Sequence, residues 1–202
     1  MRSAKVTLIW AALAAVLCVP IVLAAASPLL EWRGPVYILA GFAGIAGLGL
    51  ILVQPLLIAG YLPGLSTFRG RRVHHWIGAT LVAAVVIHVG GLWYTSPPDM
   101  IDALSFTSPT PFSPFGVVAM WAIFAVAVLA VLRRKLGPRA WRIVHMTLAA
   151  IIVAGVVVHA ALVEGAMETV SKLILCALVV AAAMTVMAGV LMRRRRVTPR
   201  AR

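Results

Sequence analysis

The chain has 202 residues and a formal net charge of +13, yet only 11% of its residues are charged and 63% are hydrophobic. Soluble domains carry about a quarter charged residues, so this composition excludes a soluble globular protein. The basic residues occur in short groups between apolar runs, which is typical of membrane proteins, so membrane lipid is the expected surrounding and nucleic acid is not an expected partner.

Six apolar runs follow one another along the chain, each close to the ~20 residues with which a helix crosses a bilayer. Backbone groups in lipid have to be paired within their own segment, so these runs are expected to be helices. They are residues 6–26, 36–58, 73–93, 115–132, 143–162 and 173–192. We therefore predict an all-α membrane protein, a bundle of about six transmembrane helices. Residues 1–35 would hold the first helix and an outer loop, residues 36–192 the main helical domain, and residues 193–202 a basic cytoplasmic tail.

The first run, residues 6–26, allows two interpretations. A short basic start and the small residues at positions 24–27 resemble a signal peptide with its cleavage site. The apolar stretch of about 21 residues is longer than the roughly 7–15 that such a peptide usually has. We favour a retained transmembrane helix, whereas cleavage would leave five spans with the same orientation downstream.

The charged residues alternate from one connection to the next. Of the 18 Lys and Arg, 16 lie at the N-terminus, between the second and third runs, between the fourth and fifth runs, and at the C-terminus; the exceptions are Arg33 and Lys172. All five acidic residues lie in the other three connections. Cytoplasmic connections carry the excess of basic residues. Both termini are therefore predicted to lie in the cytoplasm, in a multi-pass protein of the bacterial inner (plasma) membrane.

The longest outer connection, residues 94–114, contains five prolines, two aspartates and no Lys or Arg. We expect an ordered loop or a short interfacial helix around residues 100–106. No glycine-rich nucleotide fingerprint such as GxGxxG or a P-loop occurs in the sequence, so no flavin or nicotinamide site is expected in this chain.

All five histidines lie in the third and fifth runs, where ionisable side chains are costly and usually mark a functional site. His74 and His88 are 14 residues apart, and so are His145 and His159. On a helix, 14 residues turn through about 1400°, so both members of a pair share nearly the same face, about 21 Å apart along the axis. His75 is 13 residues from His88, which places these two about 140° apart. We therefore prefer His74 and keep His75 as the alternative.

The third and fifth runs cross the membrane in the same direction, because one run separates them. If the two helices face each other, His74 is level with His145 near the cytoplasm, and His88 is level with His159 near the outer surface. A flat macrocycle needs an axial nitrogen ligand on each face, and neutral imidazole supplies it. The two levels therefore predict two b-type haems with these four histidines as the metal ligands. No CxxCH motif for covalent haem attachment is present.

These residues also allow other interpretations. Membrane histidines also form hydrogen bonds between helices. A free metal ion or a proton relay would want carboxylates beside the histidines, and no Asp or Glu lies inside any run. Arg72 and Arg142, at the cytoplasmic ends of the histidine helices, could pair with haem propionates, but membrane topology explains them equally well. No residue has the character of a catalytic acid, base or nucleophile.

The histidine segments resemble a known family. Residues 71–78 (RRVHHWIG) with His88, and residues 141–145 (WRIVH) with His159, are similar to the ferric reductase-like transmembrane domain superfamily. That superfamily includes ferric reductases, NADPH oxidases and the haem membrane subunit of the bacterial periplasmic methionine sulfoxide reductase. The resemblance covers residues 36–192 and implies stacked b haems between two helices, with His74, His88, His145 and His159 as axial ligands. The flavin- and nicotinamide-binding domain of the eukaryotic members has no counterpart in this sequence.

The resemblance implies the membrane haem component of an oxidoreductase, which moves electrons from the cytoplasmic side to an acceptor outside. The expected donor is a separate cytoplasmic reductase or membrane quinol. The expected acceptor is an extracytoplasmic redox partner, ferric ion or dioxygen. Two alternatives are a quinol-oxidising cytochrome b subunit of another complex and a haem-free permease or assembly protein whose histidines pack helices.

Overall fold

The computed structural model describes residues 2–197, and every regular element in that part of the chain is a helix. The α-helices are α1 (Arg2–Ala25), α2 (Pro35–Ala59), α3 (Thr67–Thr95), α4 (Pro97–Leu104), α5 (Ser113–Leu132), α6 (Pro138–Leu162) and α7 (Thr169–Val197). Two short 3-10 helices, η1 (Pro28–Leu30) and η2 (Arg133–Lys135), lie in connections. All the α-helices except α4 are long and apolar enough to cross a membrane. The predicted all-α membrane protein with six spans is confirmed.

Two helices begin well before their apolar runs. α3 starts at Thr67 rather than at residue 73, because Ser66 caps its N-terminus by accepting a hydrogen bond from the Arg69 backbone N–H at 3.4 Å. α6 starts at Pro138 rather than at residue 143, since a proline at the first helical position has a suitable backbone angle and no N–H to pair. Basic first turns therefore extend both helices beyond the limits that hydropathy predicts.

The outer connection between α3 and α5 contains the short helix expected there. It begins earlier than residues 100–106, with two prolines in its first turn, and ends at Leu104. The backbone N–H groups of Thr107 and Ser108 donate to the Asp102 carbonyl oxygen at 2.9 and 3.0 Å. These bonds close the end of α4, which packs against α3 and α5. The connection is therefore an ordered structure at one end of the bundle.

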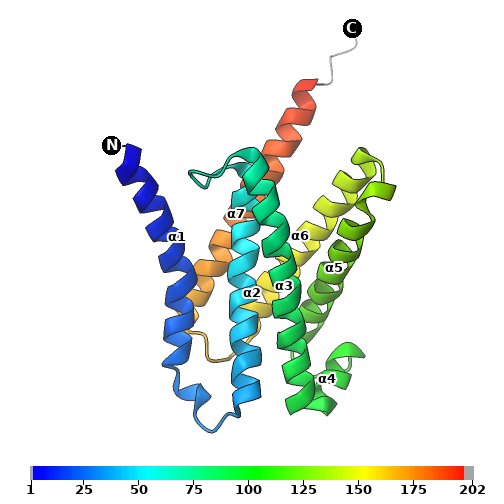
Figure 1. The fold of residues 1–202 in the computed structure, drawn as a ribbon. Helices are drawn as coiled ribbons and strands as arrows, with labels where there is room; N and C mark the ends of the chain where they lie inside the picture. Colours follow the sequence, from blue (N-terminus) through cyan, green and yellow to red (C-terminus); the bar gives the residue numbers. More distant parts are fainter. Residues whose placement is uncertain (1, 198–202) are drawn as a thin grey trace.

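Five of the helices form a closed ring. α2 packs along α3, α5 packs along α6, α7 contacts both α2 and α6, and α3 contacts α5. α1 lies outside this ring, against α2 and α7 (Figure 1). In this order around the ring α3 and α6 are never neighbours. The two helices that carry the histidines therefore lie on opposite sides of the ring interior.

The ends of the bundle differ in charge. α1 begins and α7 ends at the same end of the bundle, where the α2–α3 and α5–α6 connections also lie (Figure 1). Within residues 2–197 these segments hold 14 of the 16 described basic residues, all except Arg33 and Lys172. The α1–α2 connection, α4 and the α6–α7 connection, which hold all five acidic residues, lie toward the other end (Figure 1). Residues 198–202 of the predicted basic tail lie outside the described residues.

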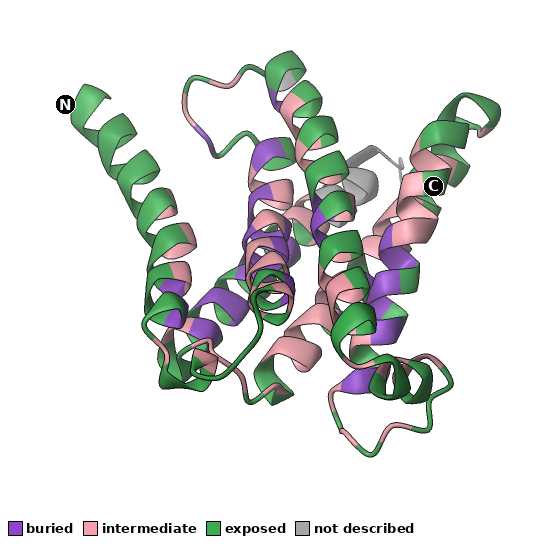
Figure 2. Ribbon diagram, turned by 60° about the horizontal axis from the view of Figure 1, so that its bottom comes forward, coloured by how far each residue is buried: buried purple, intermediate pink, exposed green. Residues whose placement is uncertain are grey.

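The core lies inside the ring, and the outer surface is apolar as well. Leu175 and Val179 of α7 are the largest fully buried side chains. Figure 2 shows the buried residues on the inward faces of the helices, with exposed residues around them. A surface rich in exposed Leu, Val and Ile is expected where the solvent is lipid. The main core cluster contains Leu48, Ile51, Leu52, Leu81, Ala122, Ile123, Ile152, Leu175, Cys176, Val179 and Ala182.

Glycines allow the two closest helix pairs to touch. A Cβ atom on Gly91 of α3 would lie 2.7 Å from the Ala40 Cβ of α2. A Cβ atom on Gly155 of α6 would lie 2.9 Å from the Phe115 carbonyl oxygen of α5. Neither gap accommodates a methyl group, so α2–α3 and α5–α6 pack backbone against backbone, as small residues permit in membrane helices. Both contacts lie close to the outer histidines.

Candidate functional site

The four histidines meet in two pairs across the ring interior. The rings of His74 in α3 and His145 in α6 have centroids 6.3 Å apart, with an angle of 72° between their planes. Those of His88 in α3 and His159 in α6 have centroids 6.5 Å apart and an angle of 80°. All four side chains are half-buried. The level pairs expected from the 14-residue spacing are therefore present.

The separation within each pair suits one metal atom held between two rings. Two imidazoles that bind a metal from opposite faces, each through a bond of about 2 Å, have ring centroids roughly 6 Å apart. Within residues 2–197, no cluster of three or more His, Cys, Asp or Glu side chains converges on one point. A bare zinc-like ion takes about four protein or water ligands. A site with two histidines and no third protein ligand fits better a group that brings its own equatorial ligands, as haem does.

Backbone carbonyls fix the tautomer of the outer histidines. The Nδ1 atom of His88 lies 2.8 Å from the Ala40 carbonyl oxygen of α2, and the Nδ1 atom of His159 lies 3.0 Å from the Phe112 carbonyl oxygen just before α5. A carbonyl only accepts, so each Nδ1 donates and each Nε2 keeps its lone pair. This is the arrangement by which an outer hydrogen bond orients a metal-ligating histidine.

A glycine makes room for each outer ring. A Cβ atom on Gly44 would lie 2.9 Å from the Nδ1 atom of His88, and one on Gly116 would lie 2.5 Å from the Nδ1 atom of His159. Each glycine is four residues after the residue whose carbonyl accepts the bond, so carbonyl and glycine stand one helical turn apart on α2 and again on α5. From the sequence Gly44 was expected only to let helices pack closely and Gly116 was not singled out, because an apolar run with many small residues does not show which of them faces a histidine.

The inner histidines are held differently. Within residues 2–197 the buried Nδ1 atoms of His74 and His145 make no hydrogen bond of normal geometry, and neither does the side-chain oxygen of Gln54, although the Gln54 backbone of α2 lies near His74. The Gln54 amide nitrogen lies 3.3 Å from the position of a Cβ on Gly78, one turn after His74 in α3. Sequence reasoning missed Gln54, although it is the only side-chain amide in the chain and lies inside an apolar run.

An aromatic ring supports the other inner histidine. Trp141 stacks on His145 with centroids 5.0 Å apart and 21° between the planes, and the Arg133 guanidinium lies 5.7 Å from the Trp141 ring. Trp141 precedes His145 by four residues, which places both on one face of α6. That spacing was a signal in the sequence that sequence reasoning did not use.

The remaining predicted site residues lie at the surface. His75, the alternative to His74, is exposed, and the structure brings His74 rather than His75 opposite His145. Arg72 and Arg142 are exposed at the end of the bundle that holds the inner pair. Their side chains therefore do not line the interior between α3 and α6.

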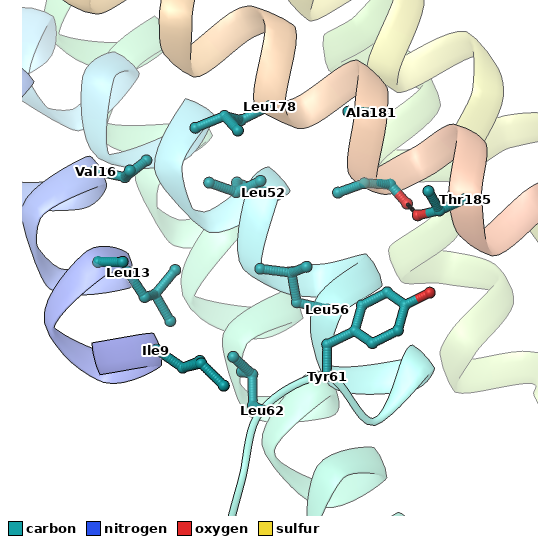
Figure 3. Close-up of a pocket in the computed structure, with 12 residues that line it drawn as sticks. Ile9, Leu13, Val16, Leu52, Leu56, Tyr61, Leu62, Leu178, Ala181 and Thr185 are labelled. Carbon is teal, nitrogen blue, oxygen red and sulfur yellow. Dashed lines mark hydrogen bonds between the residues drawn. The ribbon is translucent and has the colours of Figure 1, made fainter. Parts of the chain in front are cut away.

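A separate hollow lies outside the ring. It is an apolar groove of about 400 Å³ between α1, α2, α7 and the start of the α2–α3 connection (Figure 3). Its polar groups are the hydroxyls of Tyr61 and Thr185, and the Thr185 hydroxyl donates to the Ala182 carbonyl oxygen at 2.8 Å. It is lined by Ile9, Ala12, Leu13, Val16, Leu52, Leu56, Tyr61, Leu62, Leu178, Ala181, Ala182 and Thr185. None of the histidines contributes to it.

Comparison with known proteins gives one match. Residues 11–156 match the family described as Ferric reductase like transmembrane component. The matched range runs from α1 into α6 and includes His74, His88 and His145, while His159 lies three residues beyond its end. No curated protein and no solved structure matches the chain.

Proposed function

Because the chain belongs to the ferric reductase-like transmembrane family, we propose that it is a b-type di-haem protein that carries electrons across a bacterial inner membrane. The single observation that carries the proposal is the presence of two facing histidine pairs, with centroids 6.3 and 6.5 Å apart, inside a ring of membrane helices. His74 and His145 would hold the inner haem, and His88 and His159 the outer one. Haem, when bound, supplies one-electron chemistry.

The residues around the pairs support this role in different ways. The Ala40 and Phe112 carbonyls keep the Nε2 atoms of the outer histidines free to bind metal. Buried apolar side chains such as Leu81 and Ile152, which belong to the core cluster, exclude water from the interior. In the described part of the chain no Asp, Glu or Cys joins the histidines in a cluster, and we infer that the substrate is reduced at the outer surface or on a partner protein.

The charge distribution supports an orientation for this transport. With the basic end in the cytoplasm, electrons would move from the inner pair's side to an acceptor outside the membrane. Arg72 and Arg142 at the basic end are available to an inner propionate or to an acidic partner surface. A separate cytoplasmic reductase is then the first candidate donor.

A membrane quinol is the second candidate donor, and the apolar groove favours it. A groove of about 400 Å³ with a phenol and one other hydroxyl has the size and lining of a site for a small apolar ligand. Its lining includes Ile9 of α1 and Tyr61 and Leu62 of the α2–α3 connection, which lies at the basic end of the bundle (Figure 1). With a quinol donor the chain would act as the cytochrome b subunit of a quinol-oxidising complex.

The first test of the proposal is the visible spectrum of the purified protein, reduced minus oxidised, with a pyridine haemochrome assay. We expect about two low-spin b haems per chain. His88→Ala should remove the outer haem and leave the inner one. A protein from haem-supplied cells that carries no haem would contradict the proposal and favour the permease or assembly interpretation; two haems in His88→Ala would refute the pairing.

A further inference from the structure

Lys172, near the start of α7, is an unusual membrane lysine. Among the described residues it is the one charged side chain that is buried, with 6% of its surface exposed. It lies one turn before Cys176 and close to Leu175, both of which belong to the core cluster. Lysine is almost never buried without a partner, because removing an ammonium group from water is costly.

The surroundings of the ammonium leave most of its hydrogen-bonding capacity unused. In the described part of the chain its one hydrogen bond is donated to the Val163 carbonyl oxygen, at 2.8 Å. An ammonium group has three donors. The neighbouring carboxylate, Glu168, is exposed and accepts from the backbone N–H groups of Val170 and Ser171 at 2.7 and 2.6 Å. These N–H groups, Ser171 first, lower the pKa of Glu168, and the charge of Lys172 contributes least.

The position of Lys172 relates it to the outer histidine pair. Val163 is the C-cap residue of α6, and its N–H donates to the His159 carbonyl oxygen at 3.0 Å. The ammonium therefore lies at the C-terminus of α6, about one turn beyond a histidine of the outer pair. Ser113, the other buried polar residue, directly follows Phe112, whose carbonyl binds the same histidine. The outer level thus has polar groups on two sides of His159.

We propose that Lys172 binds a carboxylate carried by the ligand of the outer histidine pair, namely a propionate of the outer haem. This inference rests on the proposed function. Haem b carries two carboxylates, and a buried ammonium with free donors is complementary to one of them. The other basic residue on this side, Arg33, is exposed and lies over the Tyr37 ring at 4.7 Å. Lys172 is thus the buried cation available at this level.

A purely structural role is the alternative. A lysine at a helix C-terminus also interacts favourably with the last carbonyls and with the helix dipole. Lys172→Gln separates the two roles, because glutamine can still donate to the Val163 carbonyl but has no charge. If removal of the charge alone weakens haem binding, Lys172 binds a carboxylate. If haem binding is weakened only when the hydrogen bond to Val163 is lost, Lys172 is a helix cap.

The test compares two porphyrins in the full-length chain. A His74→Ala background keeps only the outer pair, and its apoprotein is titrated with haem and with haem dimethyl ester, followed by the Soret band. With Lys172 present, haem should bind about tenfold or more tightly than the ester, as for a charge-assisted hydrogen bond. Lys172→Gln should bind both porphyrins equally, Lys172→Arg should restore the preference, and Arg33→Gln, the control, should keep it.

The outcomes separate this inference from the proposed function. If Lys172→Gln weakens the binding of both porphyrins by the same factor, the preference for haem over the ester is unchanged. In that case Lys172 does not bind the carboxylate and the inference is wrong. If the parent chain with both histidine pairs binds no haem at all, the proposed function itself fails. If Lys172→Gln does not fold, Lys172→Arg is titrated in place of the parent. This variant still tests whether the preference for haem over the ester depends on a cation at position 172.

Discussion

The outer histidines are oriented by backbone carbonyls and glycines, which do not ionise. Each ring touches a backbone carbonyl and the space above a glycine, on α2 for His88 and on α5 for His159. A methyl group in either space would push the ring away from its carbonyl, so the glycines matter for the direction of the Nε2 atom. At the inner level Trp141 stacks on His145, and the Gln54 amide lies beside Gly78, one turn after His74.

A single methyl group should therefore weaken the outer site. Gly116→Ala would place a Cβ atom 2.5 Å from the Nδ1 atom of His159. Overpacking of this kind costs about 1–3 kcal/mol. We expect a partial or complete loss of the outer haem with the inner one retained, measured as haem per chain and as the reduced-minus-oxidised spectrum.

Gly41→Ala on α2 is the control, because a Cβ atom there meets nothing within 4 Å. It should keep the full haem content. An unchanged spectrum and haem content in Gly116→Ala would mean that the His159 ring does not depend on this space.

At the same scale, the sequence predicted some site residues and not others. The four histidines could be identified because a 14-residue spacing on a helix fixes a common face, and because ionisable residues are rare in apolar runs. The carbonyls of Ala40 and Phe112 could not, since every residue has a carbonyl and only the packing of α2 and α5 selects these two. His74 was preferred to His75 from helix geometry alone, and the structure brings His74 to His145.

The helices show where hydropathy is sufficient and where it is not. Six apolar runs gave six spans, but α3 and α6 begin earlier than their runs, where Ser66 and Pro138 start a helix that carries basic residues. Hydropathy indicates which residues lie in the lipid, whereas the first residue of a helix is decided by its N-terminal cap. The runs also gave no information on which helices pack together, because helices that are apolar all round have no polar face to indicate their neighbours.

Gly90 and Gly91 are adjacent in α3, and close contact between α2 and α3 should depend on Gly91 alone. Gly91→Ala would bring a Cβ atom within 2.7 Å of the Ala40 Cβ and 3.3 Å of the Val36 carbonyl oxygen. We expect a lower thermal unfolding temperature in detergent, from a destabilisation of about 1–3 kcal/mol. Gly90→Ala is the matched control, since nothing lies within 4 Å of its Cβ position. Equal unfolding temperatures for the two variants would contradict the close approach of α2 and α3.

On the scale of the whole molecule, the separation of charge between the two ends predicts the orientation in the membrane. The basic segments lie at one end of the bundle and the acidic residues toward the other (Figure 1). Excess basic residues are retained in the cytoplasm. The ring itself could not be predicted from the sequence, because α7 joins α2 and α6 through apolar contacts that no motif marks.

This orientation is testable with reporters. Alkaline phosphatase and green fluorescent protein are fused in turn after the last residue and within residues 105–112. We expect fluorescence but no phosphatase activity from the C-terminal fusion, and phosphatase activity from the fusion in the outer connection, because each reporter works on one side of a bacterial inner membrane. The reverse pattern would overturn the proposed direction of electron transport.

The repeated carbonyl and glycine around the outer histidines has a consequence for how such a molecule can be assembled. The α2–α3 pair and the α5–α6 pair cross the membrane in the same order of directions and present the same arrangement to the outer level. The residue whose carbonyl accepts the hydrogen bond precedes the histidine by 48 residues in the first pair and by 47 in the second. Two copies of one hairpin module, related by an axis along the membrane normal, would reproduce that level. The inner level breaks this internal symmetry, with an amide from one half and a tryptophan from the other. The outer level therefore has an approximate internal repeat that the inner level does not share.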